Sequence, residues 1–199
     1  MGRRWRWGWW AGLMAIALIF TVGTAQAQIP VQPEGGEAPP ALVNRLRDFD
    51  VETAPTATGF ALWPAGPNLR HEVWYRIVGG DALFEQRLRV YKEQAPPRPI
   101  DELPPPTFQV DEIYSNRGTG WRYLGFEGDF FTYYFEGDHR RLGSADWGDA
   151  FAARARKVVY ENGDRYEIFF EDQQSLDDYN DLMVEVVMLR RHRFPSPVL

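Results

Sequence analysis

The sequence predicts a mainly β protein, a single domain whose strands form an antiparallel meander, folded as a barrel or a sandwich and closed by one C-terminal helix. Short segments rich in aromatic and β-branched residues are separated by glycine, proline, asparagine and aspartate, as strands are. An Asn-Gly pair between two apolar runs indicates a hairpin, and apolar residues near every 3.6 positions indicate a helix at the end of the chain. Roughly eight strands and a terminal helix also fit a lipocalin-like barrel.

Residues 1–27 have the features of an export signal. Three arginines at positions 3, 4 and 6 precede an uncharged apolar run, and Ala25 and Ala27 supply the small residues that signal peptidase requires. The uncharged run is about 19 residues, close to the length that spans a bilayer, so an uncleaved membrane anchor is the alternative. Both interpretations place the rest of the chain outside the inner membrane, as a periplasmic or secreted protein or as a periplasmic domain on an inner-membrane anchor.

Composition excludes several classes of protein. The chain has no cysteine, which rules out disulfides, thiolate zinc sites and cysteine nucleophiles. Without the three leader arginines, 19 basic and 28 acidic residues remain, for a formal charge of −9. Nucleic acid and anionic lipid headgroups would be repelled by this charge, so we expect no nucleic-acid partner and membrane contact only through an uncleaved N-terminal segment.

Two segments have the composition of linkers. Residues 28–57 begin with a stretch rich in proline and glycine and are interpreted as a tether between the leader and a domain spanning 58–199. Residues 95–106 hold six prolines, which predicts an extended loop. This loop is either a stiff crossover between two halves of the sheet system or a docking strip for a partner.

Six strands are predicted before residue 140, and two glycine-containing links among them indicate hairpins, at 78–82 and at 127–129. Asn162-Gly163 predicts a third hairpin, between 158–161 and 165–171. The competing interpretation is a helix over 145–160 that ends at Gly163, which would make the fold α+β. The six earlier strands are expected at 58–64, 71–78, 83–92, 108–114, 120–126 and 130–136.

The stretch from Val158 to Asp172, VVYENGDRYEIFFED, resembles the second half of a MORN repeat, which pairs strands around a similar Tyr, Asn-Gly, Tyr pattern. The resemblance covers 15 residues and occurs once. It implies a hairpin and no function.

The terminal helix is predicted over 175–193. Ser175 can cap its first turn, acidic residues follow at the positive end of the helix dipole, and Pro195 ends it. Apolar side chains then form one stripe toward the core. The stripe comprises Leu176, Tyr179, Leu182, Met183, Val186, Val187 and Leu189.

The tetrapeptide Phe-Glu-Gly-Asp occurs at 126–129 and again at 135–138. A calcium site is one reading of this repeat, and two similar turns at the ends of one strand are the reading we favour, so no metal or cofactor is predicted. Glu136, Asp138 and His139 could supply acid-base groups to an envelope enzyme. No serine, phosphate-loop or other catalytic context accompanies them, so no catalytic residue is assigned.

The chain has more aromatic residues than one face of a small sheet can bury. Alternate residues of a strand point to the same face, so several of these rings should lie together. We therefore predict an aromatic face that binds a protein partner or an apolar small molecule, on an exported, non-catalytic binding protein. The first alternative is an accessory subunit of a membrane complex held by the N-terminal helix, and the second is the envelope enzyme using residues 136–139. The face comprises Trp121, Tyr123, Phe131, Tyr133 and Phe135.

Overall fold

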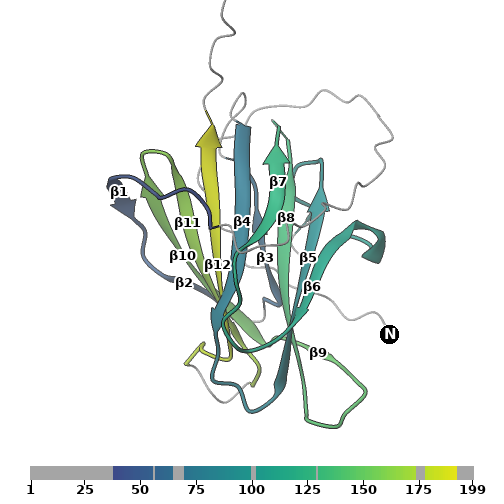
Figure 1. The fold of residues 1–199 in the computed structure, drawn as a ribbon. Helices are drawn as coiled ribbons and strands as arrows, with labels where there is room; N and C mark the ends of the chain where they lie inside the picture. The colour runs from purple at the N-terminus through teal and green to yellow at the C-terminus, as the bar shows by residue number, and fades with distance from the viewer. Residues whose placement is uncertain are drawn as a thin grey trace, which may run out of the picture.

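Two antiparallel sheets make up the described part of the chain in the computed structural model (Figure 1). The structure describes residues 38–55, 57–64, 70–99, 102–128, 130–173 and 178–191. The predicted leader, residues 1–27, lies outside these ranges, as does the start of the predicted tether. Within the described ranges, no helix has the length and apolar character of a membrane span.

The larger sheet has the strand order β1-β10-β11-β12-β4-β7, with β2 also paired to β10. Its strands are β1 (Arg45–Asp48), β2 (Glu52–Pro55), β4 (Arg70–Gly79), β7 (Arg122–Glu127), β10 (Ala152–Tyr160), β11 (Gly163–Glu171) and β12 (Leu182–Arg191).

The smaller sheet has the order β3-β8-β5-β6, with β9 also paired to β8. Its strands are β3 (Gly59–Leu62), β5 (Glu85–Glu93), β6 (Gln109–Tyr114), β8 (Thr132–Arg140) and β9 (Gly148–Asp149), and a 3-10 turn, η1 (Pro106–Phe108), precedes β6.

One hydrophobic core lies between the two sheets, built from the inward residues of both. Tyr133 and Phe135 of β8 face Tyr75 of β4, and Val184 and Val186 of β12 are fully buried beside them. Alternate residues point to opposite faces of a strand, so the intervening side chains lie on the outer faces. No hydrogen-bonded ladder joins the two sheets among the described strands. The sandwich form of the prediction is therefore found, and barrel closure, including the lipocalin-like form, is not.

The predicted C-terminal helix is wrong, because residues 182–191 form strand β12 between β11 and β4. Apolar residues are so dense here that the segment satisfies a period of 2 as well as 3.6: Val184, Val186 and Met188 are buried in the core on one face. Three valines favour the extended backbone, where their branched side chains pack well. The predicted cap at Ser175 and the end of that helix lie outside the described residues.

The Asn162-Gly163 hairpin is confirmed, since β10 and β11 pair across it from Tyr160↔Gly163 to Ala152↔Glu171. The alternative helix over 145–160, and with it the α+β layout, is wrong. The other two predicted hairpins are also wrong. β4 and β5 belong to different sheets, and so do β7 and β8, so the links at 78–82 and 127–129 carry the chain from one sheet to the other.

Gly80 is required for a reason other than turn formation. A Cβ atom at this position would lie 2.0 Å from the backbone oxygen of Asp181, which no side chain could tolerate. The amide of Asp81 also donates to the backbone oxygen of Asn180 at 2.9 Å. The β4–β5 link is thus held closely against the residues that precede β12.

Part of the predicted tether belongs to the domain, because β1 and β2 pair with β10. Asn162 fixes the segment before β1: its Nδ2 donates to the Ala41 oxygen and its Oδ1 accepts from the Val43 amide, both at 2.8 Å. Leu42 packs against Trp74 on the outer face of the larger sheet.

The proline-rich segment joins β5 and β6, which are neighbours in one sheet, so it is not a crossover between two halves of the sheet system. It lies over the outer face of the smaller sheet, where Leu103 packs against Tyr91 and Tyr134. The amide of Arg98 donates to the Tyr134 hydroxyl at 2.9 Å, and its guanidinium pairs with Glu93.

Candidate functional site

A pocket of about 410 Å³ lies at the end of the sandwich where β8 and β11 finish. It is an open pocket, bordered by the end of β8, the β8–β9 loop and β9, and by the residues just before β5, just before β10 and just after β11. The pocket is lined by Phe84, His139, Arg140, Arg141, Ser144, Asp146, Gly148, Phe151, Asp172 and Gln173.

His139 is the best placed polar group in this pocket. Its ring stacks on Phe84 with the centroids 5.7 Å apart and lies 5.5 Å from the ring of Phe151. Its Nδ1 is buried and has no hydrogen-bond partner among the described residues. Burial lowers the pKa of the imidazole, while the carboxylates Asp138 and Asp149 act in the opposite direction. The imidazole is therefore mainly neutral at pH 7.

Charged groups of both signs border the pocket. The Nε2 of Gln86 donates to Oδ2 of Asp172 at 2.7 Å, while Oδ1 of Asp172 is buried with no hydrogen-bond partner in the described structure. Arg140 is paired with Glu85. Arg141 is exposed, with its guanidinium carbon 5.9 Å from the centre of the Phe84 ring. The pocket thus combines aromatic surface with hydrogen-bonding groups.

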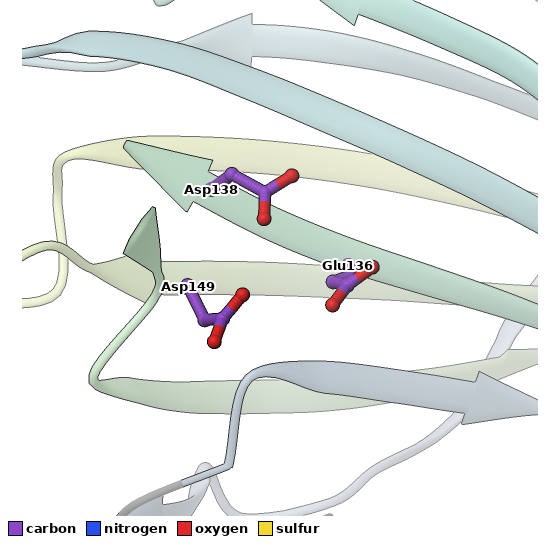
Figure 2. Close-up of side chains that lie close together, drawn as sticks. All are labelled: Glu136, Asp138 and Asp149. Atoms are coloured by element: carbon purple, nitrogen blue, oxygen red, sulfur yellow. The ribbon is translucent and has the colours of Figure 1, made fainter. Parts of the chain in front are cut away.

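A first group of three carboxylates lies on the outer face of the smaller sheet, Glu136 and Asp138 on β8 and Asp149 on β9 (Figure 2). Arg89 contacts Glu136 at 2.9 Å and Asp138 at 2.6 Å, and Arg87 contacts Asp138 at 2.9 Å. Residues 136 and 138 are two apart, so β8 presents both on one side, opposite arginines of β5 at the paired positions.

Burial raises the pKa of Glu136 to about 8. The nearby Asp138 and Asp149 add to this rise, whereas Arg89 and the hydrogen bond from the Tyr91 hydroxyl oppose it. Glu136 is therefore mostly protonated at neutral pH, and the charge of Arg89 is balanced by Asp138.

Glu136→Gln should reduce the pH dependence of stability. The carboxyl has a pKa of about 4.5 in the unfolded chain and about 8 in the folded one, so between these values the folded state binds more protons and stability falls as pH rises. The groups facing it are Arg87, Arg89, Tyr91, Asp138 and Asp149. We expect wild type to lose on the order of 3 kcal/mol more than Glu136→Gln between pH 5 and pH 8, as measured by urea unfolding. Parallel pH profiles for the two proteins would contradict this assignment.

A second group of three carboxylates adjoins the pocket: Glu171 at the end of β11, Asp172 after it, and Asp181 immediately before β12. All three side chains are buried. The Asp172 amide donates to Asp181 at 2.7 Å, and the amides of Gln173 and Tyr179 donate to Glu171, each at 3.2 Å. Burial raises the pKa of Glu171 to about 7 and also raises those of Asp172 and Asp181.

The three residues predicted as an acid-base site lie on opposite faces of β8. Glu136 and Asp138 face outward together, whereas His139 lies at the pocket between the sheets. The second Phe-Glu-Gly-Asp copy is strand, not turn, because residues 135–138 lie within β8. The turn reading of the repeat is therefore wrong for this copy.

The residues of the predicted aromatic face also lie in two different places. Phe131, Tyr133 and Phe135 do share one face, but that face is the core, where each is at most 2% exposed. Trp121 and Tyr123 lie on the outer face of the larger sheet, where the Tyr123 ring is 4.7 Å from that of Trp74. The five residues therefore form no common surface.

Sequence reasoning did not single out Phe84, Phe151 or Asp172 as site residues, because nothing local distinguishes them from core and loop residues. The carboxylates near the pocket did leave a signal, since residues 171–181 are dense in acids. Only the acids after Ser175 fit the start of the predicted helix, and that helix hides their proximity to Glu171 and Asp172.

Comparison of the chain with known protein families, with curated proteins and with solved structures finds no significant match. Its function must therefore be inferred from the geometry alone.

Proposed function

We propose that this chain is an exported, non-catalytic binding protein of the cell envelope that holds a small ligand in the pocket at the end of the sandwich. The main support is the pocket lining, which brings the rings of Phe84, His139 and Phe151 together with polar side chains. Apolar surface with a few hydrogen-bonding groups is typical of sites for small ligands.

The lining favours a ligand that is only partly apolar. Phe84, His139 and Phe151 provide ring surface for a flat or apolar portion. Asp146 and Asp172 line the pocket, and a carboxylate group can only accept hydrogen bonds, so the ligand should carry a donor. Arg141 could contact an acidic group at the pocket mouth. A purely apolar ligand, the form in the sequence-based prediction, would leave these groups unsatisfied.

The geometry disfavours the enzyme alternative. Glu136 and Asp138 are at most 1% exposed, and they lie on the face of β8 opposite to His139. A substrate in the pocket would meet the imidazole without either carboxylate. Unchanged activity in cells carrying both Glu136→Gln and Asp138→Asn would remove that alternative.

Export is proposed from the leader, residues 1–27, in which three arginines precede an apolar run and a small-residue cleavage site. An accessory subunit anchored by an uncleaved helix remains the alternative form of the same proposal, with the domain in the same compartment. The mass of the purified protein separates them, because a chain that lacks residues 1–27 cannot be anchored by them.

Ser144→Trp tests the pocket, because Ser144 lines it and a tryptophan there would occupy its volume. The probe is 8-anilinonaphthalene-1-sulfonate, which combines rings, an N–H donor and an anionic group. We expect saturable binding with a fluorescence rise in wild type and at least a roughly tenfold weaker affinity in Ser144→Trp, a loss of about 1.4 kcal/mol.

Ser115→Trp is a matched control, because Ser115 forms the same turn but does not line the pocket. Ser115 Oγ accepts from the amide two residues on at 2.9 Å, as Ser144 Oγ does at 3.2 Å. The control should bind the dye as wild type does. Absence of saturable binding in wild type, or equal binding by Ser144→Trp, would overturn the proposal.

A further inference from the structure

We infer that Glu171, Asp172 and Asp181 form a binding site for one calcium ion at the edge of the pocket. The three side chains are 2%, 2% and 4% exposed, and each offers an oxygen within 4.8 Å of the others. Calcium takes oxygen ligands at about 2.3–2.6 Å, so two ligands of one ion lie at most about 5 Å apart. The three carboxylates are therefore close enough to share an ion.

Positively charged side chains do not neutralise this cluster in the part of the chain that the structure describes. Within the described residues, no lysine or arginine forms an ion pair with any of the three carboxylates. Buried carboxylates are normally paired, protonated or bound to metal. The Oδ1 atom of Asp172 is an independent sign, because it is buried in the cluster and has no hydrogen-bond partner in the described structure.

The surrounding hydrogen bonds hold the carboxylates in place without using all of their lone pairs. Gln86 holds Oδ2 of Asp172, and the Asp172 amide holds Oδ2 of Asp181. Each carboxylate oxygen can accept two hydrogen bonds, so the same oxygens can still coordinate an ion. Donors of this kind orient metal ligands in known sites. The backbone oxygen of Asp181 lies close to Gly80, which fixes the backbone just before β12.

The ligand chemistry selects calcium among common cations. All three groups are carboxylates, the hard oxygen ligands that calcium prefers, whereas zinc favours nitrogen and sulfur. The carboxylates come from both sides of the β11–β12 connection rather than from a closed cage, which suits the flexible coordination of calcium better than the strict octahedron of magnesium.

The other acidic cluster provides an internal comparison. Glu136, Asp138 and Asp149 are also within 4.8 Å, and Oε1 of Glu136 is likewise unpartnered in the described structure. Arg87 and Arg89 already supply two positive charges there, so a divalent cation would be repelled. Of the two clusters, the one at the end of β11 is the one without a paired lysine or arginine among the described residues.

Calcium titration of the chelator-treated full chain, without any pocket ligand, tests the site. We expect calorimetry to show one site with a Kd of about 10⁻⁵–10⁻³ M, and calcium to raise the melting temperature. Asp172→Asn and Glu171→Gln should each weaken binding by more than about tenfold, since even outer-shell partners contribute that much. Glu136→Gln, a matched substitution in the other cluster, should bind as wild type does.

Amide NMR of wild type locates the ion without relying on any variant to fold. The amides of Asp172, Gln173 and Tyr179, which donate to the cluster, should shift in proportion to occupancy. No calcium binding in wild type, loss of binding in Glu136→Gln, or shifts confined to other residues would overturn the inference. Asp172 also lines the pocket, so dye binding is measured in chelator-treated protein without calcium, and the two proposals then fail separately.

Discussion

Phe135→Ala is expected to lower the free energy of unfolding by about 3–5 kcal/mol, the cost of removing a large aromatic side chain from a packed core. Phe135 is fully buried between the sheets, and its ring packs edge-on against Tyr75 of the opposite sheet with centroids 5.7 Å apart. The loss should appear as a lower urea midpoint with an unchanged slope.

Phe130→Ala is the matched control, because Phe130 comes from the same aromatic run but is 68% exposed. It should change the free energy of unfolding by no more than about 0.5 kcal/mol. Equal costs at the two positions would mean that Phe135 does not lie in the core. The inward face of β8, and with it the separation of His139 from the carboxylates, would then be assigned wrongly.

Arg89→Met should lower the free energy of unfolding by about 3–5 kcal/mol, because it removes the partner of a buried charge. Asp138 is 1% exposed and accepts two hydrogen bonds from Arg89, at 2.7 and 2.6 Å. Arg87 would still contact Asp138 at 2.9 Å, but it also pairs with Glu112, so it would compensate the buried charge only in part. Thermal and urea unfolding at pH 7 would measure the loss.

A double-mutant cycle shows whether this loss comes from the charge pair. Asp138→Asn should cost less in the Arg89→Met background than in wild type, with a coupling energy of about 0.5–3 kcal/mol. Arg117→Met, at an exposed position, is the control and should change stability by no more than about 0.5 kcal/mol. Additive effects of the two substitutions would show that Arg89 stabilises the fold by packing alone.

The sequence predicted strands well where alternation and turn residues agree. The Asn162-Gly163 hairpin could be predicted because its turn residues are adjacent to both strands they join. Residues 182–191 could not be assigned by period alone, since their apolar side chains are too dense to distinguish a strand from a helix. Their extended form depends on pairing with β4, which is about 110 residues away in sequence.

Turn signals identify where the chain reverses and not which strands pair. Gly80 and Gly128 do lie in links between strands, yet each link joins two different sheets. The same limit applies to the pocket, whose lining residues come from four separate stretches of the chain. The high aromatic content does have a structural cause, but many of the rings pack in the core rather than on a binding face.

Histidine NMR during a dye titration tests the proposed pocket most directly. The ring resonances of His139 should shift with the same midpoint as the fluorescence of bound 8-anilinonaphthalene-1-sulfonate. Those of His71, which is 2% exposed and packs on Phe131 inside the sandwich, should stay unchanged. Dye fluorescence that saturates while the His139 signals do not move would place the binding site elsewhere and contradict the account.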